Sequence, residues 1–392
     1  EKIVVIDDLA NRNHFCDILI DQNWFKDLNF RYEKLLKNDC IQLLGPNFSL
    51  LRSEFRIAKK DLSPNIFKVE EIFLFFGGTD PYNLTCKFLN ILNDPVFKEI
   101  KLSVAIGENN IFKDEISRLI KLRGNSELHV QVDNVSTLIK KAQLGIGSAG
   151  VNNWERMCLA LPSMIVSFAK NHLAVLKDLI NEGFVVFLGN AQNLNECEIK
   201  EKLIQFTNNP ELLNIQRNKI FKLVDGFGAS RVIDWITGNI NKYFWEVKKA
   251  SIEDVELYYK WANDDLVRDN SLNKNLINWE KHVEWFNEKL DNKNSFLFLI
   301  NVENIPIGQV RFDNEENYIR IDYSIRKEFR GKKLGKKLLK LAINKLNHKN
   351  DKKLLGEVLP NNIASSKIFQ ELGFNLKKHP NVHIYTKDLS KV

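Results

Sequence analysis

The chain has 392 residues, of which 44% are hydrophobic and 27% are charged. This balance is typical of globular proteins and excludes wholesale disorder, collagen and coiled coil. The formal net charge of +7 suits anionic small molecules such as nucleotides, and it is too small to indicate a nucleic-acid partner. At about 150 residues per domain, the length predicts two or three domains.

The five cysteines and seven histidines indicate neither disulfides nor a metal site. No two cysteines have CxxC spacing, and the histidines are scattered without ligand spacing. The longest apolar run, 157–169, is interrupted by Pro162 and Ser163 and is too short to span a bilayer. We therefore expect reduced thiols, no metal, no membrane partner and a cytoplasmic location. The sequence leaves the oligomeric state open.

From residue 1 to about 240, short apolar runs alternate with helical patterns. Turn or polar residues bound the runs, as expected for buried strands of parallel sheets. The predicted strands are 3–6, 18–20, 72–76, 102–106, 144–146, 163–168 and 185–187. The predicted helices include 83–92, 113–121 and 151–159. This alternation predicts a doubly wound α/β fold.

A polar segment, 57–68, predicts a boundary between two α/β domains. The first domain, 1–63, is too short to be a complete doubly wound domain, and the second covers 64–240. The chain begins at Glu1 without a methionine, and 3–6 already has the pattern of a strand. We therefore expect that a further segment precedes the first domain.

After residue 239 the pattern changes to antiparallel strands followed by a helix, which predicts an α+β domain over 243–392. Its expected elements are a strand from 247, a helix at 278–290, strands at 295–301 and 318–325, a strand ending at 312, and a basic helix at 331–347. The chain therefore combines two fold types.

The strand at 318–325 leads into the turn Arg330-Gly331-Lys332-Lys333-Leu334-Gly335, which begins the basic helix. Glycines let a ligand approach the backbone, and the free N–H groups of a first helical turn attract an anion. Arg330, Lys332 and Lys336 add positive charge, so a pyrophosphate fits this site. The alternative for the lysines is an ordinary solvated helix face.

A second segment, 361–374 (NNIASSKIFQELGF), follows this turn. Together the two segments resemble the GNAT acetyltransferase superfamily, with its Q/R-x-x-G-x-G/A pyrophosphate motif and its N…A…GF segment. The resemblance covers 243–389 and implies acetyl-CoA as the co-substrate. It assigns acetyl-CoA binding to Ile325, Arg330, Gly331, Lys332, Lys333, Leu334, Gly335, Lys336 and Asn361.

Two positions depart from the pattern of this superfamily. Lys333 occupies the first glycine position of the pyrophosphate motif. Phe369 stands where many members carry a tyrosine that protonates the departing thiolate. The acid is then another group or water, and Tyr323 and Tyr385 are candidates by residue type alone.

Upstream of the turn, Trp261-Ala262-Asn263-Asp264 is followed by Arg268, Trp279, His282 and Trp285-Phe286. This stretch resembles GNAT members that acetylate amino groups on nucleotide-linked sugars, and aromatic faces beside polar groups suit a sugar. The alternative is that the residues from 279 to 286 form one packed helix face. The sequence leaves both interpretations open.

In the N-terminal region, two glycine-rich segments each join a predicted strand to a predicted helix. Gly77-Gly78-Thr79 borders the expected ligand crevice of an open α/β sheet. Ser148-Ala149-Gly150 has small residues and exposed N–H groups that suit a diphosphate. Glu155, about one and a half turns into the next helix, is placed to accept both hydroxyls of a ribose. Taken singly, each loop is better explained as a structural turn.

Together with 7–23, 44–55 and 225–232, these loops resemble the UDP-2,4-diacetamido-2,4,6-trideoxy-β-L-altropyranose hydrolase family of the pseudaminic acid pathway, over residues 1–238. The resemblance implies a GT-B-like pair of Rossmann-type domains, the first one incomplete here. It assigns UDP-sugar binding to Gly77, Gly78, Thr79, Ser148, Ala149, Gly150, Glu155, Asn171 and His172.

Two features of this resemblance affect the predicted site. Asn-Gln is the more usual pair where this chain has Asn171-His172. The family carries its catalytic base as a histidine in a glycine-rich loop that would lie upstream of Glu1. No residue of this chain is therefore assigned as the hydrolase base.

The leading hypothesis is a bifunctional nucleotide-sugar enzyme of pseudaminic acid-type biosynthesis. It would hydrolyse a UDP-2,4-diacetamido-2,4,6-trideoxyhexose to the free sugar and UDP, and it would N-acetylate a UDP-linked 4-amino sugar with acetyl-CoA. Two alternatives stay open: a GT-B glycosyltransferase, and a non-catalytic UDP-sugar-binding module attached to an active acetyltransferase.

Overall fold

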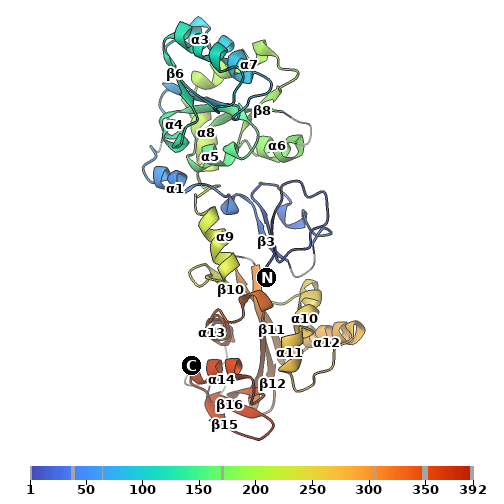
Figure 1. Cartoon of the computed structure of the whole chain (residues 1–392). Coiled ribbons are helices and arrows are strands. Elements are labelled where there is room, and N and C mark those ends of the chain that lie inside the picture. Colours follow the sequence, from blue (N-terminus) through green and yellow to red (C-terminus); the bar gives the residue numbers. More distant parts are fainter. Residues whose placement is uncertain are drawn as a thin grey trace. The chain divides into compact units, whose positions relative to one another are not determined.

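The computed structural model describes residues 2–36, 40–63, 65–168, 172–303, 305–346 and 352–388 (Figure 1). Its contacts divide the chain into two compact units. The N-terminal unit is Glu1–Leu36 with Gln42–Ile233, and the C-terminal unit is Lys37–Ile41 with Asp234–Val392. The division into three domains stays a prediction.

The N-terminal region contains two sheets. The strands of the smaller sheet, in the order β1-β2-β3, are β1 (Val4–Ile6), β2 (Ile18–Asp21) and β3 (Ile41–Leu44). The larger sheet has the order β6-β5-β4-β7-β8-β9, and each neighbouring pair is parallel. Its strands are β4 (Glu71–Phe75), β5 (Lys101–Ile106), β6 (Ser126–Val130), β7 (Leu144–Ser148), β8 (Ser163–Ser167) and β9 (Val186–Asn190).

In the larger sheet a helix connects each strand to the next one in the chain, as the alternating pattern predicts, and further helices precede and follow this sheet. The helices of the region are α1 (Ser53–Lys59), α2 (Leu84–Leu92), α3 (Lys113–Arg123), α4 (Val135–Lys141), α5 (Asn152–Cys158), α6 (His172–Asn181), α7 (Glu196–Thr207), α8 (Pro210–Phe221) and α9 (Gly228–Thr237). The predicted parallel, Rossmann-type α/β organisation of the N-terminal half is confirmed.

The strand order of the larger sheet fixes where a ligand can bind. The chain starts at the central β4, moves outward to β6, and returns to β7 on the other side of β4. Ligands of open α/β sheets bind outside the carboxyl ends of the strands at such a reversal point. The two predicted glycine-rich loops follow the two strands that flank it, β4 and β7.

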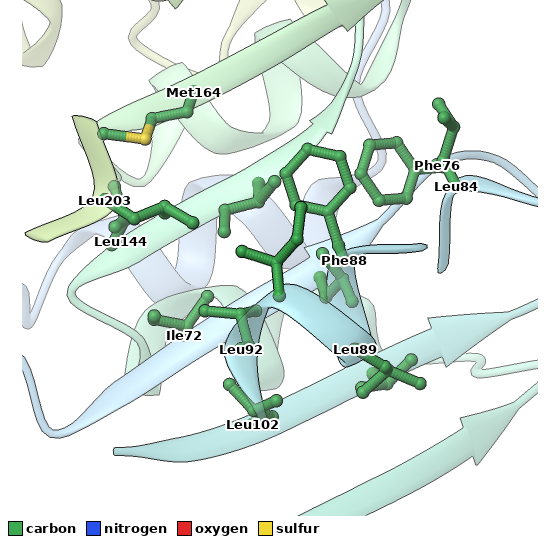
Figure 2. Close-up of a cluster of buried hydrophobic side chains, with 14 of the residues drawn as sticks. Ile72, Phe76, Leu84, Phe88, Leu89, Leu92, Leu102, Leu144, Met164 and Leu203 are labelled. Atoms are coloured by element: carbon green, nitrogen blue, oxygen red, sulfur yellow. The ribbon is translucent and has the colours of Figure 1, made fainter. Parts of the chain in front are cut away.

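Both faces of the central strands of the larger sheet are buried, which explains why β4, β5, β7 and β8 have largely apolar sequences. Along β4, Ile72 and Leu74 belong to one hydrophobic cluster, and Phe73 belongs to the other. The first cluster includes residues of α2, α3 and α7, and Figure 2 shows Phe88 and Leu89 of α2 packed in it. The second includes residues of α4, α5 and α6.

The C-terminal unit is built on one seven-stranded sheet of order β10-β11-β12-β13-β14-β16-β15. The strands are β10 (Trp245–Lys249), β11 (Ser295–Val302), β12 (Ile305–Asn314), β13 (Tyr318–Ile325), β14 (Lys353–Val358), β15 (Asn375–Lys377) and β16 (His383–Asp388). The helices are α10 (Val255–Ala262), α11 (Asp265–Asp269), α12 (Trp279–Asp291), α13 (Gly335–Lys345) and α14 (Ile363–Glu371). The predicted α+β class of this unit is confirmed.

The basic helix begins later than the predicted residue 331. Gly331 and Lys333 have left-handed φ angles of 71° and 59°, so these residues form a turn and α13 starts only at Gly335. The expected end at 347 lies outside the described residues. This late start places the turn itself, and not a helix face, beside the site described below.

Candidate active sites

The C-terminal sheet opens where β13 and β14 separate. These strands pair in parallel only as far as Ile321 and Gly356. Beyond that point β13 stays paired with β12 up to Ile325, and β14 stays paired with β16 up to Val358. The ends of β13 and β14 therefore diverge, and a cavity of about 1280 Å³ lies against them.

The turn before α13 forms part of the wall of this cavity. Lys333 replaces a motif glycine, yet its backbone keeps the left-handed conformation that favours glycine, and its side chain is exposed. Gly335 is required for close packing, because a Cβ there would lie 2.5 Å from Ile368 Cδ1. This packing brings the first N–H groups of the 11-residue helix α13 to the cavity, where they suit a pyrophosphate.

Most of the predicted acetyl-CoA residues meet at this cavity. Those that line it are Ile325, Arg330, Gly331, Lys333, Leu334, Gly335 and Lys336. Lys332 and Asn361 are not among its lining residues. The Lys332 side chain lies instead over Gly238, where an added Cβ would be 2.7 Å from Lys332 Cγ. Asn362 lines the cavity in place of its neighbour, and its side chain caps α14.

Two of the predicted cations have carboxylate partners. Arg330 Nη1 donates to Asp264 Oδ1 at 2.6 Å, and Arg330 Nε donates to the Ile325 carbonyl at 2.8 Å. Lys336 Nζ lies 3.5 Å from Glu371. The ion pair with Asp264 fixes Arg330 at the cavity and compensates part of its charge.

The two tyrosines considered as acids differ in position. Tyr323 lines the cavity, and its Oη is 3.0 Å from Ser365 Oγ. Burial raises the pKa of Tyr323 to about 12, so its hydroxyl keeps the proton at neutral pH. Tyr385 is fully buried, and its hydroxyl has no hydrogen-bond partner among the described residues. Of the two, Tyr323 is the one that can meet a thiolate in the cavity.

Phe369 is held in place by its packing. Its ring stacks on Tyr385 with 5.2 Å between centroids and lies edge-on to Tyr323 at 6.0 Å. The ring also presses against Gly356, where there is no room for a Cβ. A tyrosine hydroxyl at position 369 would therefore point at the backbone of β14.

The sheet also presents a polar wall that sequence reasoning missed. Gln309 and Arg311 of β12 pair with Ser324 and Asp322 of β13, so all four side chains point to one face of the sheet. Gln309 Nε2 donates to Asp322 Oδ1 at 3.2 Å, and Arg311 Nη2 lies 3.8 Å from Asp322. Arg311 also covers the ring of Trp285, 5.1 Å from its centroid. All five residues line the cavity.

The sequence of β12 does contain a pattern that could have predicted this wall, because polar and apolar residues alternate along the strand. Gln309 and Arg311 alternate with the buried residues Val310 and Phe312. Polar alternation on an antiparallel strand ordinarily indicates a solvated face. Tertiary structure is needed to see that α10–α12 enclose this face within a cavity.

The aromatic residues of α12 pack together, as one of the two sequence interpretations expects, and their role in binding a sugar stays a prediction. Phe286 is fully buried, and Trp279 packs edge-on against Tyr259 with 5.0 Å between centroids. His282 is almost fully buried, burial lowers its pKa, and its Nε2 lies 3.1 Å from a main-chain carbonyl of α10. Trp285 and His282 nevertheless line the cavity. One side of α12 therefore packs against neighbouring elements, and two of these residues also line the cavity.

In the N-terminal unit, the loop after β4 stays open at the reversal point. Gly77 has a φ of 95°, and Gly78 and Thr79 are exposed. The Gly78 carbonyl accepts a hydrogen bond from Gly107 N at 3.0 Å, and a Cβ on Gly107 would lie 2.8 Å from Gly78 Cα. Asp80 caps α2 through its carboxylate, so it holds the loop in shape.

In the loop after β7, the backbone N–H groups are not all exposed, although the sequence predicted that they would be. Ser148 is nearly buried, and Gly150 is exposed with a φ of 154°. The Ala149 N–H donates to the Val166 carbonyl of β8 at 3.1 Å. The expectation is therefore wrong for Ala149, because the extended chain at the end of β7 continues to pair with its neighbour.

Segments far apart in the sequence contact one another in this unit. The Gln22 side chain accepts a hydrogen bond from Leu50 N at 3.1 Å. Gly228 at the start of α9 lies against the backbone of Ser49, where an added Cβ would be 2.6 Å from Ser49 N. Three of the segments that carry the hydrolase resemblance thus form one structure, although about 200 residues separate the first from the last.

The ionisable groups at the carboxyl ends of β1 and β2 are engaged with each other. Tyr32 Oη lies 3.0 Å from Asp7 Oδ2 and 2.9 Å from Asp21 Oδ2, and all three side chains are buried. Arg31 Nε donates to Asp21 at 2.9 Å, and His14 Nε2 lies 3.5 Å from Asp7. This network holds the loops together and presents no carboxylate to a ligand.

The remaining predicted UDP-sugar residues are placed only in part. Glu155 is half-buried on α5; burial raises its pKa, and the nearby Arg52 opposes that shift. Asn171 lies outside the described residues. His172 is the first residue of α6, and its side chain lies outside the description. The roles assigned to these three residues stay predictions.

Two classes of feature are absent from the described part of the chain. None of its helices combines the length and the apolar character needed to cross a membrane. Within the same residues, no group of three or more His, Cys, Asp or Glu side chains is arranged to hold a metal ion.

Comparison with known proteins gives a family match for the C-terminal part of the chain. The family model described as acetyltransferase (GNAT) domain matches residues 246–375. The matched range contains the diverging strands and the turn at 331–335. An uncharacterized protein of Methanocaldococcus jannaschii is 26% identical over 400 aligned positions, which cover 96% of this chain and 77% of that protein.

Two characterised relatives match about half of the chain. The UDP-2,4-diacetamido-2,4,6-trideoxy-β-L-altropyranose hydrolase of Campylobacter jejuni is 28% identical, over 47% of this chain and 64% of that protein. The spore coat polysaccharide biosynthesis protein SpsG of Bacillus subtilis is 25% identical, over 48% of this chain and 56% of that protein. The chain therefore spans less than two thirds of either relative. Residues 246–375 form a GNAT acetyltransferase domain, and the N-terminal half of the chain resembles the UDP-diacetamido-trideoxy-altropyranose hydrolases.

Proposed function

We propose that this chain is a bifunctional nucleotide-sugar enzyme of pseudaminic acid-type biosynthesis. Its C-terminal domain transfers the acetyl group of acetyl-CoA to the amino group of a UDP-linked 4-amino sugar. Its N-terminal half binds a UDP-linked sugar at the β4 and β7 loops and hydrolyses a UDP-2,4-diacetamido-2,4,6-trideoxyhexose to the free sugar and UDP. The two reactions are consecutive, because the acetylated sugar nucleotide is the substrate of the hydrolysis.

The observation that carries the acetylation proposal is the pairing of two unlike walls around one cavity. The turn at 331–335 and the start of α13 offer backbone N–H groups and the side chains of Lys333 and Lys336, which suit the pyrophosphate of acetyl-CoA. The polar wall offers Gln309, Arg311 and Asp322 beside the ring of Trp285. A ring face next to convergent polar groups is the arrangement that binds a sugar.

The chemistry needs one proton acceptor and one proton donor. The acceptor amine attacks the thioester carbonyl, a C–N bond forms, and the C–S bond breaks to release the CoA thiolate. We assign the amine proton to Asp322, whose carboxylate is held by Gln309 and Arg311 and lines the cavity. We assign the thiolate proton to Tyr323, which points to the other face of β13 and bonds to Ser365.

One observation favours a second candidate for the N-terminal half, a UDP-sugar-binding module without hydrolysis. The carboxylates of Asp7 and Asp21 and the imidazole of His14 lie at the end of the first sheet, and all three are buried in one network. A buried carboxylate that accepts hydrogen bonds from its neighbours is a poor activator of water.

The test is to incubate the full chain with acetyl-CoA and UDP-4-amino-4,6-dideoxy-N-acetyl-β-L-altrosamine, and to measure free thiol and free UDP separately. Release of both supports the bifunctional enzyme. Thiol release without UDP supports the acetyltransferase with a binding module. Absence of both contradicts the proposed acceptor.

A pair of variants in the same assay tests the polar wall. Asp322→Asn removes the proton acceptor, and we expect kcat/KM for acetyl transfer to fall by about 100-fold. Glu316→Gln makes the same chemical change at an exposed turn outside the cavity, and it should leave the rate within twofold. Equal rates for both variants would exclude Asp322 as the base.

A further inference from the structure

A buried arginine lies directly behind the loop that follows β7. Arg156 of α5 is 1% exposed. Its Nη2 donates to the Ser148 carbonyl at 3.1 Å and to the Asn153 side chain. Its Nε and Nη1 are buried and have no hydrogen-bond partner among the described residues. A guanidinium has five N–H groups, so most of its donor capacity is unused here.

The sequence of β7 is shaped around this side chain. A Cβ added at Gly147 would lie 2.7 Å from Arg156 Nη1, and one added at Gly145 would lie 2.9 Å from Arg156 Cδ. The alternate residues Leu144 and Ile146 face the hydrophobic cluster on the other side of the sheet. The two glycines therefore make room for a cation in a layer that is otherwise apolar.

The charge of Arg156 is not balanced by a partner. Among the described residues no carboxylate forms an ion pair with Arg156, and Glu155 is the neighbouring acid whose charge acts on it. Burial lowers its pKa to about 10, which still leaves it protonated at neutral pH. A buried, unpaired charge is strongly destabilising, so the negative charge of a ligand bound at the nearby loop would relieve part of that cost.

We propose that Arg156 is the buried positive charge that lets the β7 loop hold the diphosphate of a nucleotide, and that it acts through the loop backbone without touching the ligand. This inference rests on the proposed UDP-sugar site. The guanidinium donates to the Ser148 carbonyl, and Gly150, two residues further on, is the exposed part of the loop. Arg156 is therefore a positioning residue, and its effect depends on ligand charge.

The test compares the affinities of the full chain for UDP and for uridine by titration calorimetry. Arg156→Met removes the charge, and we expect the preference for UDP over uridine to fall by about tenfold, with little change for uridine itself. Arg156→Lys keeps the charge, and the preference should stay within about threefold of the wild type. Arg123→Met is the matched control, because Arg123 is also buried and bonds to the carbonyls of Phe97 and Ile100.

The outcomes separate the inference from the proposal on which it rests. A wild type that binds no UDP overturns both. A wild type that prefers UDP, with the same preference in folded Arg156→Met, overturns the inference alone. If Arg156→Met does not fold, Arg156→Lys decides: a retained preference supports the role of charge, and a tenfold loss contradicts it. A loss of preference in Arg123→Met would show that any buried arginine has this effect.

Discussion

The two halves of the chain keep their ionisable groups in different places. In the N-terminal unit, Asp21, Tyr32 and Arg156 are buried beneath loops and bonded to neighbouring groups. In the C-terminal unit, Asp322 and Tyr323 line a cavity of about 1280 Å³. The first arrangement suits binding through backbone groups and fixed charge, and the second suits reactions in which side chains exchange protons.

This difference predicts how the halves respond to substitution. A site that depends on backbone conformation and on a buried charge is most sensitive to added volume behind its loops. A site that depends on side chains in a cavity tolerates small changes in its turns and loses rate when a functional group is removed. Three substitutions test this contrast, taken from the largest expected effect to the smallest.

The largest effect is expected for Gly147→Ala in the N-terminal unit. The added Cβ would meet the Phe75 carbonyl and lie 2.7 Å from Arg156 Nη1, so strand or side chain must shift. We expect a loss of about 3 kcal/mol in the free energy of unfolding, measured with urea. Gly78→Ala is the matched control, because its nearest neighbour would be 3.8 Å away. Equal losses for both variants would contradict the packing argument.

An intermediate effect is expected for Tyr323→Phe in the C-terminal unit. Removing the hydroxyl that bonds to Ser365 should lower kcat for acetyl transfer about tenfold, measured by thiol release. Tyr385→Phe removes a buried hydroxyl outside the cavity and should change kcat less than twofold. The reverse ranking would make Tyr385 the acid.

The raised pKa of Tyr323 adds a pH dependence to this prediction. Its hydroxyl ionises near pH 10 in the unfolded chain, and its pKa is raised to about 12 in the folded one. Between these values the unfolded chain loses the proton first, so the folded wild type should lose stability relative to Tyr323→Phe as pH rises from about 10 to 12. Chemical unfolding at several pH values measures this difference.

The smallest effect is expected for Lys333→Gly in the turn before α13. Glycine adopts the observed φ of 59° without the strain of a side chain, so the free energy of unfolding should rise by up to about 1 kcal/mol. Lys332→Gly removes the same charge at the adjacent position, which has no left-handed φ, and should not stabilise the protein. A destabilised Lys333→Gly would mean that the Lys333 side chain contributes more than its backbone strain costs.

Sequence patterns predicted the elements that local chemistry controls. Apolar runs predicted the central strands of the larger sheet, since burial on both faces leaves few polar positions, but the mixed sequence of the edge strand β6 was not predicted. The glycines of the 331–335 turn predicted the approach of a ligand, and the residues from 325 to 336 are brought together because they follow one another in the chain. Lys333 shows the limit of such patterns, because its glycine-like conformation is not visible in its residue type.

The sequence by itself therefore determined the fold classes, the order of the motifs and the turn beside the GNAT cavity. Tertiary structure decided which polar strand face is enclosed, which of the two tyrosines reaches the cavity, and that Arg156 lies behind the β7 loop. The physical reason is that strand pairing and helix packing bring together residues distant in sequence, such as Asp322 and Trp285. Local patterns report burial and conformation, whereas contacts between distant residues determine the chemistry of a site.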